Sequence, residues 1–177
     1  MYLSMMAADD VWQVLEALKE QAVSVWVDGG WGVDALLGRQ TRPHDDLDVV
    51  IALDRAVMVI DVLARNGYRL SEDERPTRFV MCDGRDRRID FHTVTFDAEG
   101  GGIQRLQSGR SYRYPPNGFR GRGIIAGRAI SCLTPEVQIE CHLGYEPDET
   151  DIRDVRLLCE TFGIRLPPPY HRKLLDD

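Results

Sequence analysis

The chain has 177 residues, of which 43% are hydrophobic and 29% are charged. It can therefore form one packed domain, or a domain with a small appendage, and extensive disorder is not expected. A net charge of −7 argues against non-specific nucleic-acid binding, because such binding depends on a basic surface. No apolar run is long enough to cross a membrane, and the N-terminus lacks the pattern of a signal peptide. We therefore expect a cytoplasmic protein whose four cysteines are reduced packing residues.

Helices and strands alternate in the first half of the sequence. Periodic apolar residues predict helices, which we place at residues 9–21, 31–37 and 55–66. Short apolar runs between turn residues predict strands, which we place at residues 24–28, 47–53, 79–82 and 88–96. Two consecutive strands without a helix between them indicate a mixed β-sheet and an α+β fold.

The second half of the sequence contains more glycine and proline. Residues 98–123 are expected to form long loops over a binding cleft, with one short strand near Tyr112. A small hairpin is predicted at 124–131, followed by helices at 134–144 and from Asp148 or Thr150 to Gly163. We therefore divide the chain into a sheet core at 1–96 and a loop-rich, mainly helical part at 97–177. No clear linker separates them, so the two can form one continuous domain.

Residue types that bind phosphate and metal concentrate between Asp28 and Asp48. Gly29-Gly30 lies between a strand and a helix, where backbone N–H groups can hold phosphate oxygens. Arg42 can neutralise further phosphate charge. Asp46 and Asp48 are two residues apart in a strand, so their carboxylates lie on one face and favour Mg²⁺. Each feature alone is common on protein surfaces, but their combination predicts a phosphoryl-transfer site.

Asp90 is the best candidate for a third carboxylate, which would bridge metal ions or act as a base. It lies between the apolar residues Ile89 and Phe91 in a predicted strand, and the alternative is an ordinary exposed position on that strand. His92 shares the face of Asp90 by the same two-residue spacing. It can orient Asp90, contact the substrate, or have a purely structural role.

The run from Gly29 to Ile51 strongly resembles antibiotic nucleotidyltransferases of the polymerase-β-like superfamily. Lincosamide nucleotidyltransferases and aminoglycoside 2″-adenylyltransferases share a pattern that reads here as Gly29-Gly30-Trp31, Asp34, Gly38, Arg42, His44, Asp46 and Asp48. The sequence Asp90-Phe91-His92, and the segment from Gly144-Tyr145 to Asp154, look like the lincosamide branch. The resemblance covers most of residues 10–163, although 98–123 does not align clearly.

This resemblance implies a mixed-sheet core flanked by helices and an Mg²⁺-dependent enzyme. The reaction would transfer a nucleoside monophosphate, AMP from ATP in the first instance, to a lincosamide hydroxyl and release pyrophosphate. It implies that Asp46, Asp48 and Asp90 bind the metal, and that Asp90 is also the general base. The other implied roles are triphosphate binding for Gly29, Gly30 and Arg42, and a homodimeric assembly. We also assign His44 to nucleotide binding, and from their residue types and positions we assign His92 and Tyr145 to acceptor binding.

Three alternatives stay open from the sequence. The acceptor can be an aminoglycoside, which net acidity would suit, or another compound that is not an antibiotic. It can also be a macromolecule, but a pI of about 5.1 disfavours an RNA substrate. An inert binding module is disfavoured because Asp46, Asp48 and Asp90 are all present.

Overall fold

The computed structural model describes residues 5–171 and shows the mixed-sheet α+β fold that the sequence predicts. Its helices are α1 (Ala8–Glu20), α2 (Gly29–Leu37), α3 (Ala56–Arg65), α4 (Pro135–Cys141), α5 (Glu149–Phe162) and α6 (Pro168–His171), with 3-10 turns at Leu53–Arg55 and Pro116–Arg120. Its strands are β1 (Val25–Asp28), β2 (Asp46–Ala52), β3 (Arg69–Glu74), β4 (Arg78–Cys82), β5 (Arg88–Phe96), β6 (Gly102–Arg105), β7 (Ser111–Tyr114), β8 (Gly121–Ile125) and β9 (Arg128–Cys132).

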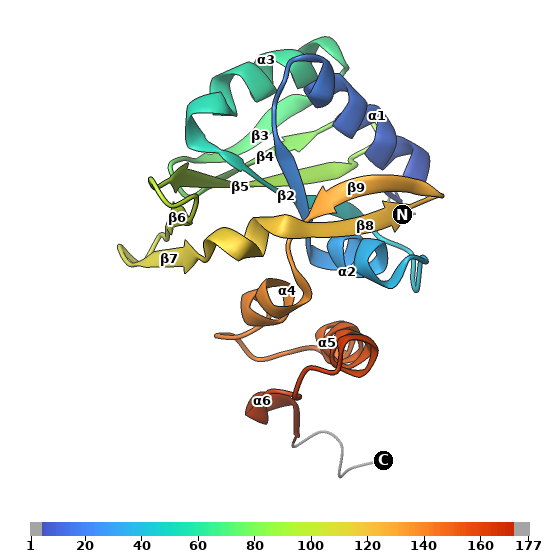
Figure 1. Cartoon of the computed structure of the whole chain (residues 1–177). Coiled ribbons are helices and arrows are strands. Elements are labelled where there is room, and N and C mark those ends of the chain that lie inside the picture. The colour runs from blue at the N-terminus through green and yellow to red at the C-terminus, as the bar shows by residue number, and fades with distance from the viewer. Residues whose placement is uncertain (1–4, 172–177) are drawn as a thin grey trace.

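The sheet has the strand order β3-β4-β5-β2-β1-β9-β8, and the β6–β7 hairpin pairs with the end of β5. Strand β2 lies near its centre, parallel to β5 and antiparallel to β1. Figure 1 shows α1 and α3 on one side of the sheet and α4, α5 and α6 on the other. The two faces of β2 therefore meet different surroundings.

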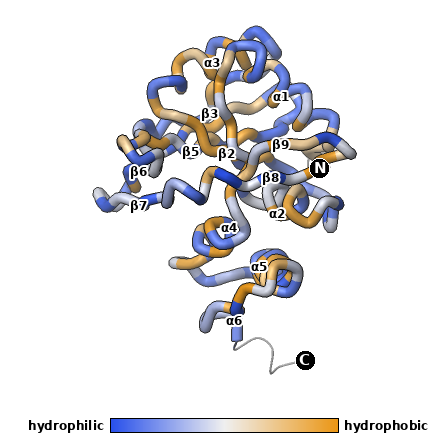
Figure 2. The backbone as a smooth tube through the Cα atoms, viewed as in Figure 1, coloured by the Kyte–Doolittle hydropathy of each residue, from blue (hydrophilic) through white to orange (hydrophobic). Residues whose placement is uncertain are grey.

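Alternating side chains give those two faces their character. Leu47, Val49 and Ile51 belong to the main hydrophobic core, together with buried residues of α1 and α3. Their neighbours Asp46 and Asp48 therefore lie on the opposite face. The same alternation in β5 buries Ile89 in the main core. Figure 2 shows hydrophobic residues along these central strands and the helices that cover them.

A second hydrophobic cluster holds the C-terminal helices beside α2. Val33 of α2 packs with Ile152 and Val155 of α5, and Tyr170 of α6 is fully buried in the same cluster. Gly163 ends α5 in a left-handed conformation, and Pro167–Pro169 follow soon after, as the sequence predicts. The C-terminal helices are thus attached to the sheet through α2, the helix that directly follows β1.

The structure corrects two expectations about local structure. Residues 98–123 are not long loops with one strand, because β6, β7 and the start of β8 lie within them. Strand β3 was not predicted, since its sequence RLSEDE is polar and it pairs only with β4 at the sheet edge. The predicted hairpin is present as β8 and β9, which join the main sheet beyond residue 96.

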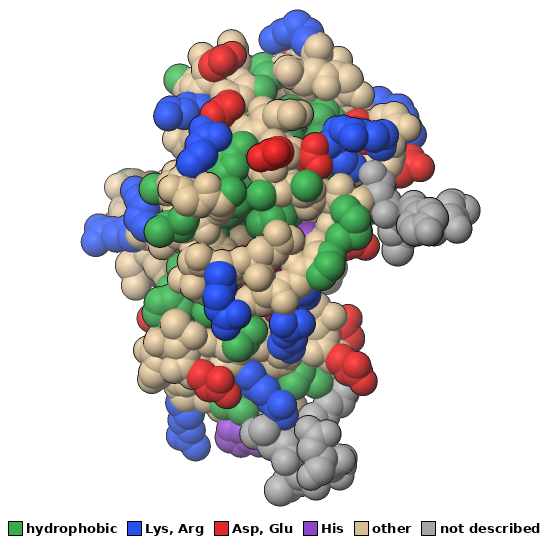
Figure 3. Space-filling model, turned by 90° about the vertical axis from the view of Figure 1, so that its right-hand side faces the viewer, with side chains coloured by type: hydrophobic (Ala, Val, Ile, Leu, Met, Phe, Trp, Pro, Cys, Tyr) green, Lys and Arg blue, Asp and Glu red, His purple; other side chains and the backbone are tan. Residues whose placement is uncertain are grey.

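The exposed face in Figure 3 mixes hydrophobic, basic and acidic side chains over the upper and lower parts of the molecule. Among residues 5–171, no helix has the length and apolar character needed to cross a membrane.

Candidate active site

Three carboxylates form a row across adjacent strands of the sheet. The antiparallel register of β1 and β2 pairs Asp28 with Asp48, and the parallel register of β2 and β5 pairs Asp48 with Asp90. Residues that are directly opposite in neighbouring strands point to the same face. The row therefore lies on the face turned away from α1 and α3. Sequence analysis predicted Asp48 and Asp90 as site residues, but it missed Asp28.

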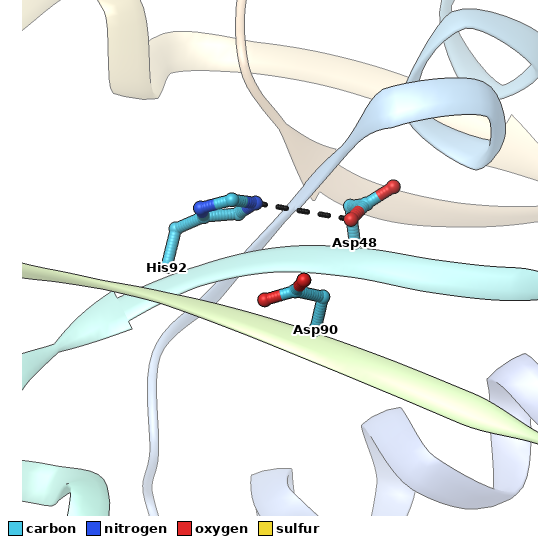
Figure 4. Close-up of side chains that lie close together, drawn as sticks. All are labelled: Asp48, Asp90 and His92. Carbon is cyan, nitrogen blue, oxygen red and sulfur yellow. Dashed lines mark ion pairs between the residues drawn. The ribbon is translucent and has the colours of Figure 1, made fainter. Parts of the chain in front are cut away.

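His92 completes a compact cluster with Asp48 and Asp90. One ligand-type atom from each of these three residues lies within 4.8 Å of the others. Figure 4 shows His92 pointing toward Asp48, with 3.8 Å between His92 Nε2 and Asp48 Oδ1. Asp46 lies two residues before Asp48 on β2 and is outside this three-residue group. The predicted metal ligands are thus on one face, and His92 lies beside Asp48 on that face.

The charges of this cluster act strongly on one another. Burial raises the pKa of Asp46 to about 6, and the charges of Asp48 and Asp45 add to that effect. Burial also raises the pKa of Asp28 and of Asp90, with a further contribution from Asp48 in each case. Burial alone would lower the pKa of His92, but the carboxylates around it raise that pKa to about 9. The site therefore favours bound positive charge.

Arg78 of β4 is a cation that sequence analysis did not single out. Its Nη1 lies 2.7 Å from Asp90 Oδ2, and its Nη2 and Nε bind Glu72 and Glu74. Asp90 is opposite Val80 in the β4–β5 register, whereas Arg78 is opposite His92. Arg78 thus reaches Asp90 diagonally across two strands, a contact that no local motif reveals.

The donor set fits a divalent cation. Asp90 Oδ1 is buried and has no hydrogen-bond partner among residues 5–171. An unsatisfied buried carboxylate oxygen costs free energy unless a cation or a donor binds it. Mg²⁺ takes oxygen ligands and commonly uses one or two carboxylates together with substrate phosphates. Asp46, Asp48 and Asp90 would hold such an ion.

The glycine turn directly adjoins the carboxylate row. Asp28 caps α2 by accepting a hydrogen bond from the Gly29 N–H at 2.8 Å. Gly29 has φ +57°, and a side chain there would overlap the Asp48 carboxylate. A Cβ on Gly30 would lie 2.5 Å from atoms of Arg42 and His44. Both glycines form the first turn of α2 beside the row. The Gly29 N–H is already bound by Asp28, so the Gly30 N–H is the glycine donor that can bind a phosphate oxygen.

Arg42 and His44 are both held by buried carboxylates. Arg42 Nη2 binds Asp154 of α5 at 2.9 Å, which ties the glycine turn to the C-terminal helices. His44 Nε2 lies 2.6 Å from Asp34 Oδ2, and its ring packs against Trp31. Asp34 is thus a buried hydrogen-bonding residue, which also accepts hydrogen bonds from the Thr41 N–H and hydroxyl. His44 supports the turn from within the core.

A cavity of about 980 Å³ opens between the carboxylate row and the C-terminal part. Asp28, Asp46 and Asp48 line it on the sheet side, with Gly29, Gly30, Arg42, Arg78 and His92 beside them. Its opposite wall includes Tyr112, Glu140, Tyr145 and Asp151. His44 and Asp90 do not line the cavity, although 20% of the Asp90 side chain is exposed. Of the predicted site residues, seven therefore line one cavity: Gly29, Gly30, Arg42, Asp46, Asp48, His92 and Tyr145.

Comparisons with known proteins show that the chain is similar to antibiotic nucleotidyltransferases. The family model for aminoglycoside-2″-adenylyltransferases matches residues 10–158. The chain is 30% identical over 149 residues to a lincosamide resistance protein of Staphylococcus haemolyticus, and the match covers 84% of this chain and 92% of that protein. It is also 30% identical over 158 residues to a 2″-aminoglycoside nucleotidyltransferase of Klebsiella pneumoniae, with 85% of each chain covered.

Two solved structures share the fold over nearly the whole chain. The lincosamide antibiotic adenylyltransferase LnuA with lincomycin bound has a TM-score of 0.79 at 28% identity, and the match covers 92% of this chain and 100% of that one. ANT(2″)-Ia in complex with adenylyl-2″-tobramycin has a TM-score of 0.71 at 25% identity, and 88% and 89% of the two chains are covered. The carboxylate row thus lies in a nucleotidyltransferase fold, and the chain belongs to the aminoglycoside-2″-adenylyltransferase family.

Proposed function

We propose that this enzyme transfers AMP from ATP to a hydroxyl group of a lincosamide antibiotic, releases pyrophosphate and thereby inactivates the drug. The observation that carries the proposal is the carboxylate row of β1, β2 and β5, of which Asp28 and Asp48 line a cavity beside the glycine turn. The relatives supply the reaction class, because both are named for antibiotic resistance or for nucleotide transfer to an antibiotic.

In this proposal the nucleotide lies at the start of α2. The N–H group of Gly30 binds a triphosphate oxygen, and the guanidinium of Arg42 offsets the phosphate charge. Gly29 has no side chain and so lets the nucleotide approach the turn closely. His44 acts from behind the turn by supporting Gly30, since its ring does not line the cavity. The triphosphate then lies next to Asp46 and Asp48, where a divalent ion is also held.

Mg²⁺ bound by Asp46, Asp48 and Asp90 would offset negative charge on the phosphate oxygens. Side chains that line the cavity hold the acceptor so that its hydroxyl oxygen is in line with the bond between the α-phosphorus and the pyrophosphate leaving group. Asp90 accepts the hydroxyl proton as the oxygen attacks the α-phosphorus. Arg78 holds the other oxygen of Asp90, which fixes the direction in which that carboxylate faces.

An aminoglycoside is the second candidate acceptor. It is favoured by the acidic residues Glu140, Asp148 and Asp151 on the cavity wall, which would attract a polycation. The lincosamide assignment is favoured by Asp90-Phe91-His92, whose two polar side chains belong to the site cluster. Tyr145 is half-exposed on the acceptor side and would contact either drug. A homodimer stays a prediction from the family resemblance, and a cytoplasmic location stays a prediction from the sequence pattern.

A mass-spectrometric screen tests the proposed function. Purified protein is incubated with Mg²⁺, one of ATP, GTP, CTP or UTP, and one member of a panel of lincosamides and aminoglycosides. We expect one lincosamide to gain the mass of a single AMP unit in the ATP reaction. Modification of aminoglycosides only would select the second candidate, and no modified drug anywhere in the panel would contradict an antibiotic acceptor.

A further inference from the structure

Gln104 of β6 connects the β6–β7 hairpin with the carboxylate site. Its side chain is buried, and its Nε2 lies 3.1 Å from the Thr77 carbonyl oxygen and 3.3 Å from His92 Nδ1. Its Oε1 accepts a hydrogen bond from the Tyr114 hydroxyl at 2.9 Å. Both ends of the amide therefore have partners, as a buried side-chain amide requires.

These partners determine which way the amide faces. A backbone carbonyl can only accept a hydrogen bond, so the amide atom beside Thr77 must be the NH₂ group. That group has a second hydrogen, which is directed at His92 Nδ1. The opposite orientation would place two acceptor oxygens, Gln104 Oε1 and Thr77 O, at a distance of about 3.1 Å without a proton between them.

We propose that Gln104 is a positioning residue that makes His92 a hydrogen-bond donor toward Asp48 and keeps it from binding the metal. Because His92 Nδ1 faces an amide donor, the neutral ring carries its proton on Nε2. His92 Nε2 is the ring atom that faces Asp48 Oδ1, at 3.8 Å. A histidine that binds a metal through Nε2 instead carries its proton on Nδ1 and donates it to an acceptor.

The proposal separates His92 from the two carboxylates with which it clusters. Distance alone allows Asp48, Asp90 and His92 to share one ion. The hydrogen bonds around Gln104 leave only Asp48 and Asp90 of this group as metal ligands. Asp46, on the same strand as Asp48, is available as a third ligand. They also give residues 98–123 a part in the site, since both Gln104 and Tyr114 come from that segment.

Long-range ¹H–¹⁵N spectra of the histidine rings test this assignment. They distinguish a proton on Nε2 from one on Nδ1, and a His92→Asn variant identifies the His92 signals among those of the four histidines. Spectra are recorded at the alkaline end of the pH range in which the protein stays folded, so that the ring is neutral, first without metal and then with Mg²⁺ and a non-hydrolysable ATP analogue. We expect the Nε2-protonated ring in both, and an Nδ1-protonated ring in wild-type protein would overturn the proposal.

Gln104→Glu should reverse the preference, because a carboxylate at this position accepts a hydrogen bond from His92 Nδ1. Tyr114→Phe is the matched control within the network, since it removes one hydrogen bond but leaves the amide donor beside Nδ1. Gln13→Glu, on an exposed position of α1, controls for the added charge. Both controls should keep the proton on Nε2, and a Gln104→Glu variant that also keeps it there would contradict the proposal.

The kinetic consequence rests on the proposed function, whereas the spectra do not. Gln104→Glu should lower kcat by roughly twofold to tenfold, the size of effect expected when one neutral hydrogen bond is lost. The KM for ATP should stay within about twofold, because Gln104 does not contact the glycine turn. If no drug is modified at all, the proposed function fails while the spectra still decide the role of Gln104.

Discussion

The two walls of the cavity hold their side chains in different ways. On the sheet side, Asp28, Asp48 and Asp90 are fixed by the register of three adjacent strands. On the opposite side, Tyr145 lies in the turn before α5, about half-exposed, with a single hydrogen bond to Asp151. Groups that are fixed in this way suit chemistry that requires exact alignment. An open wall with few contacts suits recognition of an acceptor of variable shape.

This difference predicts that substitutions on the sheet side change kcat or the KM for ATP, and that substitutions on the opposite side change the KM for the acceptor. The predictions that follow test that division, starting with the largest expected effect.

Asp48→Asn should abolish turnover while the protein stays folded. Asp48 is central to the row, so its loss removes a metal ligand and also relieves repulsion with Asp28 and Asp90. The melting temperature should therefore stay equal or rise slightly. Pyrophosphate release and thermal melting measure the two effects. Near-normal turnover at ordinary Mg²⁺ concentrations would break the assignment of the sheet side to chemistry.

Asp90→Asn should lower kcat by roughly 10²-fold to 10⁴-fold, the usual contribution of a general base, with little change in acceptor binding. Steady-state kinetics with both substrates measure this split. If Asp90 mainly binds metal, higher Mg²⁺ concentrations should restore part of the loss. Wild-type kinetics in this variant would mean that Asp90 has no catalytic role and only forms a structural ion pair with Arg78.

Gly30→Val should raise the KM for ATP by at least about tenfold, which corresponds to about 1.4 kcal/mol. The added side chain would overlap Arg42 and His44, which lie 2.5 Å from the position of a Cβ. Gly38→Ala is a control for glycine replacement at the far end of α2, where no atom lies within 4 Å of the added Cβ. It tests the folding effect of strain at φ +70°. An unchanged ATP KM in Gly30→Val would make the turn purely structural.

The stabilisation of the protein by Mg²⁺ should increase with pH, because the site loses protons and gains net negative charge as the pH rises. The pKa of Asp46 is about 6 in the fold against an ordinary value of 3.8, so the folded state holds this proton more tightly than the unfolded chain does. Its contribution to stability is therefore present at low pH and lost between about pH 4 and 6. His92 has a pKa of about 9 in the fold against an ordinary value of 6.5. Its contribution to the stability of the fold is likewise lost as the pH rises, between about pH 6.5 and 9.

Bound Mg²⁺ compensates the carboxylate charge that remains. At roughly 100 times its Kd, an ion adds about 2.7 kcal/mol, or on the order of 5–10 °C in melting temperature for a chain of this size. Melting curves between pH 5 and 9, with and without Mg²⁺, measure the difference. The increment should be absent in Asp48→Asn, and a wild-type increment that does not change with pH would contradict the charge balance described for the row.

Tyr145→Phe should have the smallest effect, a change of a few-fold in the KM for the acceptor. The hydroxyl group makes one exposed hydrogen bond of 3.2 Å with Asp151, and such a bond contributes about 0.5–1.5 kcal/mol. Both kcat and the KM for ATP should stay at wild-type values. A loss in kcat of the size expected for Asp90→Asn would show that catalysis and acceptor binding are not separated between the two walls.

Much of the sheet side could be predicted from the sequence because its signals are local. The two-residue spacing of Asp46 and Asp48 predicts that their side chains lie on one face of a strand. Gly29-Gly30 predicts the point at which β1 ends and α2 begins. The pairing of Asp28 with Asp48 was not predictable in this way, because α2 separates the two strands and only the folded sheet sets their register. Asp90 could be proposed by residue type, but its position opposite Asp48 depends on the parallel pairing of β2 with β5.

The contacts of Arg78 and Gln104 were not predictable for a related reason. Arg78 belongs to a strand that contains no recognisable sequence motif. Gln104 belongs to a short strand in a glycine-rich segment, where neither strand propensity nor hydrophobic periodicity is strong. Each acts on a residue 12 positions away in the sequence. His44 shows the opposite case, since it is part of the recognisable pattern and yet supports the turn from the core without lining the cavity.

One measurement tests the central claim, that the carboxylate row transfers AMP to an antibiotic, most directly. Wild-type protein and Asp48→Asn are incubated side by side with ATP, Mg²⁺ and lincomycin, and both pyrophosphate and the mass of the drug are followed. We predict that wild-type protein releases one pyrophosphate for each lincomycin that gains one AMP, and that Asp48→Asn yields neither product. Equal product from both proteins would contradict the role of the row, and unmodified lincomycin in the wild-type reaction would contradict the assigned acceptor.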